Sequence, residues 1–314
     1  MLTYLLGGDV NVYRKWTLLL FKFNCNVTFI NRRKCLSSNC RSISGVGLGA
    51  MIEKERTLFL SMRDPDDGIN YALNILGFTA KEHQQANYLD DPFTLLKKQI
   101  KQDPVILGPL DMGELTYLPN HENLYGADHY VLGYQMDNEN IYLQDPAGFP
   151  FVPLSLDQFR KAWMAEKIPY RKGFYKYWSS PKKVVSLDDN DIYERAIHYF
   201  KRTYLEFEKA DIGLTGREAI RYYADQLQNG PITADIIGHT TFFLFQLGAR
   251  RANDYAMLFK DRHSHLSPLK TEQAKVLGMC HSMSVNKDWK GISEKLMKLA
   301  DLEGNFRLEL LKGG

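Results

Sequence analysis

The sequence places a histidine and an aspartate where a β-hairpin would bring them together. Two apolar runs flank a short polar turn at residues 137–140, and that pattern predicts a two-stranded hairpin. In the simplest register His129 lies opposite Pro146 and beside Asp145. A carboxylate that accepts a hydrogen bond from one imidazole nitrogen fixes the tautomer and leaves the other nitrogen free to act as a base. We therefore expect a hydrogen-bonded His129–Asp145 pair, with a half-buried structural histidine as the alternative.

A nucleophile for such a pair is available near the start of the chain. Cys25, Cys35 and Cys40 lie close together, whereas Cys280 stands alone. The thiolate is the reactive form of cysteine, and its pKa falls beside an imidazolium or at a helix N-terminus. The residues after Cys25 and after Cys35 both suit the start of a helix, so the residues alone leave the choice open. A buried, inert thiol is the alternative for each cysteine.

The residue spacing argues against metal and nucleotide sites. The three early cysteines contain no Cys-x2-Cys pair, which structural zinc sites commonly use. The segment Gly45–Ala50 fits the pattern G-x-G-x-x-A, but the next predicted strand starts at Thr57, too soon for the crossover helix of a dinucleotide-binding fold. We interpret this segment as a tight turn or a close backbone approach. We expect no metal and no organic cofactor.

Composition and charge exclude several classes of protein. The chain has 314 residues, of which 44% are hydrophobic, enough for a sizeable core. Lys and Arg number 40 and Asp and Glu number 37, a net charge of +3 without the basic excess of a dedicated nucleic-acid-binding protein. The longest apolar run, at residues 16–21, is too short to span a membrane, and the first residues lack a signal-peptide pattern. With only 4 cysteines as well, we predict a cytoplasmic protein that binds neither nucleic acid nor membrane.

The character of the sequence changes near residue 180. Before that point, short apolar runs that predict strands alternate with helical patterns; the strands are Thr57–Met62, Val105–Leu107, His129–Tyr134, Ile141–Leu143 and Phe174–Trp178, and the helices are Gly68–Leu76, Pro92–Lys101 and Leu156–Ala165. After a polar linker, the spacing is helical to the end, with a predicted capping box at Thr215 and Glu218. We predict an α+β catalytic domain over residues 1–180 and an all-α domain over residues 188–314, a bundle of about five helices.

Several segments, taken in order, resemble one known family. They are Pro104–Gly113, Leu115–Pro119, Gly126–Tyr130, Tyr142–Pro146 and Val152–Leu156 with Trp163. They resemble the amino-terminal domain of the butirosin biosynthesis protein H family, which is related to papain-like cysteine peptidases and in particular to bacteriocin leader peptidases. The resemblance extends over about residues 45 to 178, and the helical half is similar to the domain that commonly follows.

The resemblance implies a papain-like fold and a Cys-His-Asp triad. In this interpretation Cys25, ahead of the glycine-rich turn, is the nucleophile, His129 is the general base and Asp145 orients the imidazole. The peptidase relatives use a glutamine before the cysteine as an oxyanion donor, and here Asn24 or backbone N–H groups take that place. Cys35 and Cys40 stay open as alternative nucleophiles.

The same resemblance implies a reaction and its partners. The butirosin protein moves an aminoacyl group from a carrier-protein thioester to an aminoglycoside amine. For this chain the resemblance therefore implies a cysteine-dependent acyltransferase of secondary-metabolite biosynthesis, with an acyl carrier protein whose phosphopantetheine arm delivers the acyl group and a small-molecule amine as acceptor. The alternatives are a cysteine peptidase or amidohydrolase with the same triad, and a non-catalytic binding module that has lost its nucleophile.

Overall fold

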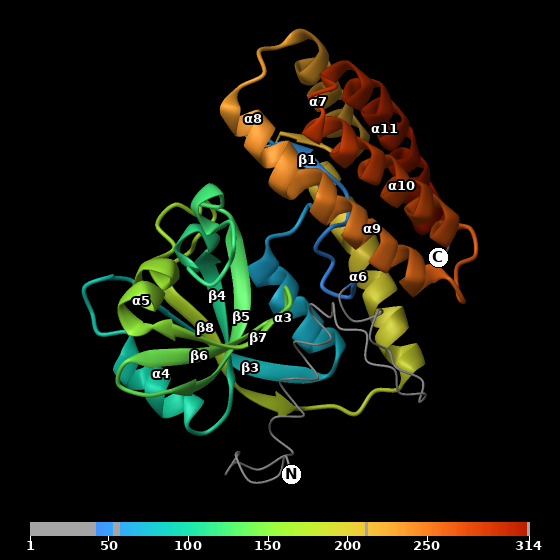
Figure 1. Cartoon of the computed structure of the whole chain (residues 1–314). Coiled ribbons are helices and arrows are strands. Elements are labelled where there is room, and N and C mark those ends of the chain that lie inside the picture. The colour runs from blue at the N-terminus through green and yellow to red at the C-terminus, as the bar shows by residue number, and fades with distance from the viewer. Residues whose placement is uncertain (1–41, 53–56, 211–212, 313–314) are drawn as a thin grey trace, which may run out of the picture. The chain divides into compact units, whose positions relative to one another are not determined.

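The protein is a mixed α+β molecule of two compact units, and the predicted α+β class is confirmed (Figure 1). A computed structural model describes residues 42–52, 57–210 and 213–312. In these ranges the first unit comprises Gly77–Ser186, and the second comprises the described parts of Ser38–Leu76 and of Leu187–Gly314.

The first unit is built on a six-stranded sheet in the order β3-β8-β4-β5-β6-β7, in which every neighbouring pair is antiparallel. The strands are β3 (Phe78–Gln85), β4 (Val105–Asp111), β5 (Asp128–Met136), β6 (Asn140–Asp145), β7 (Phe149–Ser155) and β8 (Phe174–Lys183). Four predicted strands lie in this sheet, namely Val105–Leu107, His129–Tyr134, Ile141–Leu143 and Phe174–Trp178. The fifth, Thr57–Met62, contains the strand Leu58–Phe59, which belongs to a separate small sheet of the second unit. The edge strands β3 and β7 were not predicted, because an edge strand with few buried side chains lacks a strong apolar pattern.

Two helices, α4 (Phe93–Ile100) and α5 (Leu156–Met164), pack against the sheet and enclose the core of the first unit. Ser155 caps α5, since its hydroxyl accepts from the Gln158 amide at 3.3 Å. The indole Nε1 of Trp163 donates to the carbonyl oxygen of Lys176 at 2.8 Å and so ties α5 to β8. This packing fixes the face of the sheet on which the site is built.

Strand β6 shows how the sequence selects that face. Its burial alternates along the strand, with Ile141, Leu143 and Asp145 buried. Because successive side chains of a strand point to opposite faces, Asp145 shares the core-facing side with the two apolar residues. A carboxylate is thus carried into the edge of an apolar core.

The second unit is mainly helical, as the sequence predicts for the C-terminal half (Figure 1). Its helices are α3 (Pro65–Ile75), α6 (Asp189–Lys209), α7 (Gly216–Asn229), α8 (Ala234–His239), the π-helical turn η3 (Thr240–Leu244), α9 (Phe245–Phe259), α10 (Leu266–Val285) and α11 (Trp289–Lys312). Helix α10 packs against α9 and α11, and α11 packs against α7. A small sheet, in the order β2-β1-β9, joins Leu58–Phe59, Met51–Ile52 and Leu214–Thr215.

The described residues of the segment 42–76 belong to the helical unit, although the sequence predicts them in the first domain. Ala50, Ile52 and Leu58 are buried in the same core as residues of α7, α10 and α11. Strand β1 pairs with β9 as well as with β2. A pairing between segments so far apart in the chain leaves no local pattern from which it could be predicted.

Two local predictions in this unit have different outcomes. The glycine-rich segment is a tight turn with a close approach, as predicted, since Gly47 has φ of +94° and a Cβ there would lie 2.6 Å from the side chain of Arg251. The predicted capping box at Thr215 and Glu218 is wrong, because the Thr215 side chain makes no capping hydrogen bond. Instead Thr215 pairs with Met51 in the small sheet.

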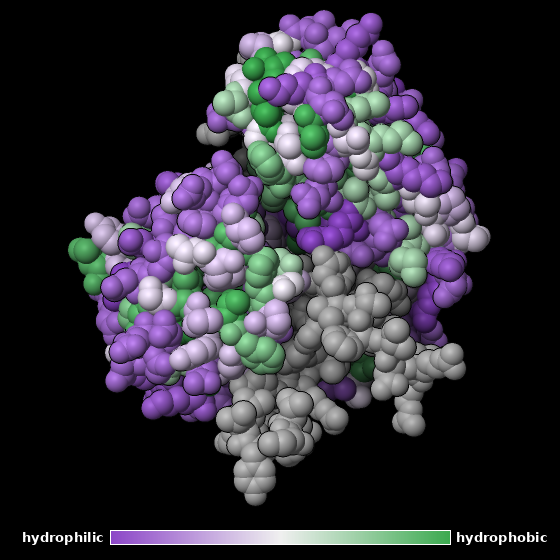
Figure 2. Space-filling view, viewed as in Figure 1, coloured by the Kyte–Doolittle hydropathy of each residue, from purple (hydrophilic) through white to green (hydrophobic). Residues whose placement is uncertain are grey.

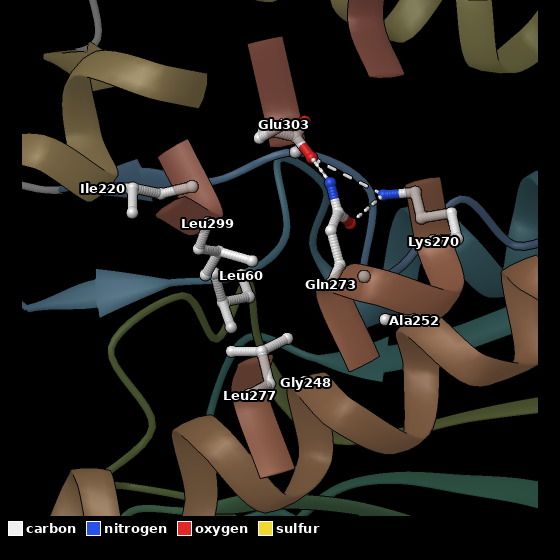
Figure 3. Close-up of a pocket in the computed structure, with 11 residues that line it drawn as sticks. Leu60, Ile220, Gly248, Ala252, Lys270, Gln273, Leu277, Leu299 and Glu303 are labelled. Atoms are coloured by element: carbon white, nitrogen blue, oxygen red, sulfur yellow. Dashed lines mark hydrogen bonds and ion pairs between the residues drawn. The ribbon is translucent and has the colours of Figure 1, made fainter. Parts of the chain in front are cut away.

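A buried polar cluster crosses the core of the helical unit (Figure 3). The Lys270 ammonium donates to Gln273 Oε1 at 2.8 Å and lies 3.5 Å from Glu303 Oε2, and Gln273 Nε2 donates to the same carboxylate oxygen at 2.9 Å. The Tyr204 hydroxyl donates to the other oxygen of Glu303. Burial lowers the pKa of Lys270, while the Glu303 carboxylate acts in the opposite direction. Each buried charge therefore depends on its partner.

Replacing Glu303 by alanine leaves Lys270 buried without its counter-charge. We expect the Glu303→Ala variant to lose about 3–5 kcal/mol of unfolding free energy, measured by urea denaturation. The double variant Lys270→Met/Glu303→Leu is expected to recover most of this loss, because it removes both charges. Glu272→Ala, which breaks the exposed pair with Lys275, serves as a control and is expected to change little. Equal losses for Glu303→Ala and Glu272→Ala would contradict the account.

Candidate active site

The structure brings His129 and Asp145 together at the edge of the core of the first unit. His129 lies near the start of β5 and Asp145 ends β6. The imidazole Nε2 and the carboxylate Oδ2 are 2.8 Å apart. The side chain of Asp145 is fully buried and that of His129 is 12% exposed. The histidine is therefore the member of the pair that solvent or a substrate can reach.

The register that joins the two strands differs from the predicted one. Leu132 pairs with Gln144, so His129 is not opposite Pro146, and the register shifts between Gly133 and Gln135. A β-bulge of this kind inserts a residue into one strand and re-aims the side chains beyond it. The pair still forms because both side chains lie on the same face of the sheet.

Three donors surround the Asp145 carboxylate. Oδ2 accepts from His129 and from the Tyr117 hydroxyl, each at 2.8 Å, and Oδ1 accepts from the Ala147 amide at 2.6 Å. Burial on its own raises the pKa of Asp145, but the charge and hydrogen bond of His129, helped by the other two donors, outweigh it and the net shift is downward. Asp145 is thus an anion at neutral pH and acts only as an acceptor.

The ionised carboxylate determines the state of the imidazole. Because Asp145 cannot donate, the proton of the shared hydrogen bond belongs to His129 Nε2. In the neutral ring the other nitrogen, Nδ1, is then unprotonated. Among the described residues the only hydrogen bond of this ring is the one to Asp145. The arrangement leaves Nδ1 able to accept a proton from a group that approaches it.

Tyr117 is a member of the site that the sequence analysis missed. It lies in the loop between η1 (Met112–Glu114) and η2 (His121–Asn123), and its ring is 5.9 Å from that of Phe149. Burial, together with the negative charge of Asp145, raises the pKa of Tyr117, so the hydroxyl stays protonated and donates. The sequence around Tyr117 gave no sign of this contact, because no pattern within a loop indicates which strand a tyrosine will meet.

Asp111 closes the longer loop from Gly113 to Gly126, which carries Tyr117, beside His129. Its carboxylate Oδ1 accepts from the Gly113 amide at 2.9 Å and from the Gly126 amide at 3.0 Å. Leu110 pairs with His129 across β4 and β5. Burial raises the pKa of Asp111 despite these two hydrogen bonds. The loop is therefore closed by a buried carboxylate next to the histidine.

The predicted nucleophiles and oxyanion donor lie outside the described residues: Cys25, with Cys35 and Cys40 as alternatives, and Asn24. Cys280 is the free cysteine of the described part of the chain. It is buried in α10, and burial raises the pKa of its thiol to about 12. Cys280 has the properties of an inert packing residue.

Another histidine of the first unit is paired with a hydroxyl group, but this pair is less suited to catalysis. His83 Nε2 and Ser179 Oγ are 2.8 Å apart, and the imidazole stacks on Tyr177. Burial, followed by the charge of Lys81, lowers the pKa of His83. Ser179, however, is only 1% exposed, so its hydroxyl is closed to a substrate.

A cavity lined by described residues of the helical unit is also unsuited to a substrate (Figure 3). Leu60, Ile220, Leu277 and Leu299 form its apolar side, and the Lys270 cluster forms its polar side. The volume of this cavity that is open to the centre of a water molecule is only about 20 Å³. This is room for about one water molecule, so the cavity is a feature of core packing.

The residues that the structure describes contain no cluster of metal ligands and no membrane-spanning helix. Across residues 42–52, 57–210 and 213–312, no three His, Cys, Asp or Glu side chains gather closely enough to hold a metal ion. None of the helices described there has the length and apolar character to cross a membrane. On the face seen in Figure 2, hydrophilic residues predominate and the hydrophobic areas between them are smaller.

Comparison with known proteins identifies the family. A family model described as the YobF C-terminal domain matches residues 211–311. A protein of Bacillus subtilis (strain 168), described as "Uncharacterized protein YobF", is 84% identical over 272 residues, which cover 87% of this chain and 89% of that protein. The chain belongs to the YobF family.

The assignment to the butirosin biosynthesis protein H family is therefore wrong. The matches found are to YobF and not to that family. The segments that suggested it are short, and several coincide with elements that any packed sheet requires. Pro104–Gly113, for example, contains β4, which is buried along its whole length. Packing alone selects apolar residues in such a strand.

The lowered pKa of Asp145 predicts a pH dependence of stability. Its folded pKa lies below the ordinary value of 3.8, so the stabilisation by the ionised group is complete above that value and is lost as the pH falls through the folded pKa. We expect the urea midpoint of the unaltered protein to fall more steeply between about pH 5 and pH 2 than that of Asp145→Asn. Parallel curves for the two proteins would show that Asp145 is not stabilised as an anion.

Proposed function

We propose that this member of the YobF family is a cysteine-dependent acyltransferase whose reaction takes place at the His129–Asp145 pair. The observation that carries the proposal is the hydrogen bond between His129 Nε2 and a fully buried, ionised Asp145. A histidine held in this way by a carboxylate is the base of nucleophilic triads on unrelated folds. The family name itself supplies no activity, so the proposal rests on the residues.

The thiol comes from the first part of the chain. The sequence has 4 cysteines, and Cys280 is buried with a raised thiol pKa of about 12. Cys25 is the first candidate, with Cys35 and Cys40 as alternatives.

An antiparallel sheet that carries the histidine and the carboxylate on neighbouring strands supports the papain-like fold as the proposed fold of the first unit. A reducing compartment, such as the cytoplasm, would keep such a thiol free.

The proposed reaction has two halves. Nδ1 of His129 takes the proton of the cysteine thiol, and the thiolate attacks the carbonyl carbon of an acyl thioester. Asp145 stabilises the imidazolium, which returns its proton to the departing thiol as the acyl-enzyme forms. In the second half an amine attacks the carbonyl carbon of the acyl-enzyme, the bond from that carbon to the cysteine sulfur breaks, and His129 takes a proton from the amine and returns it to the cysteine thiolate. The products are an amide and the free cysteine, so no cofactor is consumed.

The donor and the acceptor are proposed by class. A thioester donor is favoured because a thiolate and a thioester exchange acyl groups at little cost in free energy, and the phosphopantetheine arm of an acyl carrier protein presents such a thioester. A small-molecule amine is the proposed acceptor. Asn24 or backbone N–H groups are the proposed donors to the oxyanion.

Thiol alkylation tests whether His129 activates a cysteine. With iodoacetamide at neutral pH, we expect one of Cys25, Cys35 and Cys40 to react faster than a free thiol, and His129→Ala to slow that reaction about tenfold or more. Peptide mass spectrometry identifies the labelled residue. His83→Ala is the matched control, because His83 lies in the same unit and bonds to Ser179 instead. An unchanged rate in His129→Ala would overturn the proposal.

A model reaction distinguishes transfer from hydrolysis. The protein is incubated with an acyl-pantetheine thioester and a panel of small amines, and the products are separated by mass. We expect an amide product that depends on His129. Release of the free acid alone, at the same rate with and without amine, would show a hydrolase; no turnover together with no reactive thiol would show a binding module. Either result rejects the transferase.

A further inference from the structure

The Asp145 carboxylate has a second side-chain donor besides the proposed base. The Tyr117 hydroxyl and His129 Nε2 both bond to Oδ2, each at 2.8 Å. The Ala147 amide bonds to Oδ1 at 2.6 Å. With both acceptor positions of Oδ2 occupied, the carboxylate cannot turn without breaking one of these bonds.

The tyrosine acts as a constant donor. Burial first, and then the charge of Asp145, raise the pKa of Tyr117. Ionisation of the phenol would place two negative charges side by side in a buried site. The hydroxyl therefore stays protonated throughout the neutral range, and its proton points to a carboxylate that only accepts.

The loop that carries Tyr117 is braced at several points. Asp111 accepts from the amides of Gly113 and Gly126. Gln158 Nε2, on α5, donates to the Glu114 carbonyl oxygen and to the Glu114 carboxylate, each at 2.8 Å. These contacts fix the loop to the core helix, so the position of the hydroxyl is set by the rest of the unit.

We infer that Tyr117 is a positioning residue for the active site: by sharing Oδ2 with His129, it locks the Asp145 carboxylate in the orientation and charge state that keep the neutral imidazole protonated at Nε2. The inference rests on the proposed function of the same site. Tyr117 touches the carboxylate and not the reacting atoms, so it acts through Asp145. Its loss is expected to lower kcat and to leave KM nearly unchanged.

The Tyr117→Phe variant tests this inference, because it removes the hydroxyl and keeps the ring. Nitrogen-15 spectra of the histidine rings report which nitrogen of His129 carries the proton, and carbon-13 spectra report the titration of the Asp145 carboxyl group. We expect the unaltered protein to show the Nε2–H tautomer alone. In the variant we expect a mixture of the two tautomers of His129. We also expect the titration of the Asp145 carboxyl group to have its midpoint at a higher pH, and alkylation of the reactive cysteine to be about 10–100-fold slower.

Tyr177→Phe is the matched control. Tyr177 is buried in the core against which Tyr117 packs, and its hydroxyl has no hydrogen-bond partner among the described residues. We expect this variant to keep the tautomer, the Asp145 midpoint and the alkylation rate of the unaltered protein. Urea denaturation of both variants shows whether each remains folded. The spectra themselves are recorded without urea.

The outcomes separate this inference from the proposed function. If Tyr117→Phe behaves as Tyr177→Phe does in tautomer, midpoint and rate, the inference is overturned, whatever the activity of the unaltered protein. If no cysteine of the unaltered protein is activated, the proposed function fails, and the two spectra still decide whether Tyr117 sets the state of the His129–Asp145 pair. If Tyr117→Phe does not fold, Asp111→Ala, which removes the acceptor of both hydrogen bonds that close the same loop, is expected to give the same mixture of tautomers, and an unmixed Nε2–H tautomer would overturn the inference.

Discussion

The site depends on one constraint, the need of a fully buried carboxylate for donors. Asp145 has no exposed side-chain surface, so its charge is stable only if protein groups replace the water that it has lost. The donors come from β5, from the loop between η1 and η2, and from the turn after β6. Because one anion needs all three, it fixes three separate segments of the chain relative to one another. The orientation of His129 follows from that requirement.

The same constraint recurs in the helical unit with a different result. There the buried Glu303 is matched by Lys270, Gln273 and Tyr204, and every partner is buried. Near Asp145 the partners are not all buried, and the titratable one, His129, remains partly exposed. A buried ionic cluster closed on all sides stabilises or specifies a fold, whereas one that presents a titratable ring to the outside can exchange a proton with a ligand. This difference is why we assign the chemistry to the first unit.

Local patterns in the sequence predicted the strands of the site better than the register in which those strands pair. The β5–β6 hairpin could be predicted because its apolar runs and its polar turn are adjacent, and so could the meeting of His129 with Asp145. The register could not, since the shift between Gly133 and Gln135 is a property of the paired strands. Tyr117 could not be predicted either, because a loop has no periodicity. The pairing of β1 with β9 escaped for a related reason, since it joins segments distant in the chain. The family inferred from short segments was wrong because buried strands of unrelated proteins share their apolar residues.

The central claim is that His129, held by Asp145, activates a cysteine that carries an acyl group. The most direct measurement is the intact mass of the protein after brief exposure to an acyl-pantetheine thioester without an amine, followed by peptide mapping. The account predicts a mass increase of one acyl group on Cys25, or on Cys35 or Cys40, which is lost on addition of an amine and is absent from His129→Ala. An unmodified protein, or modification that is equal in His129→Ala, would contradict it.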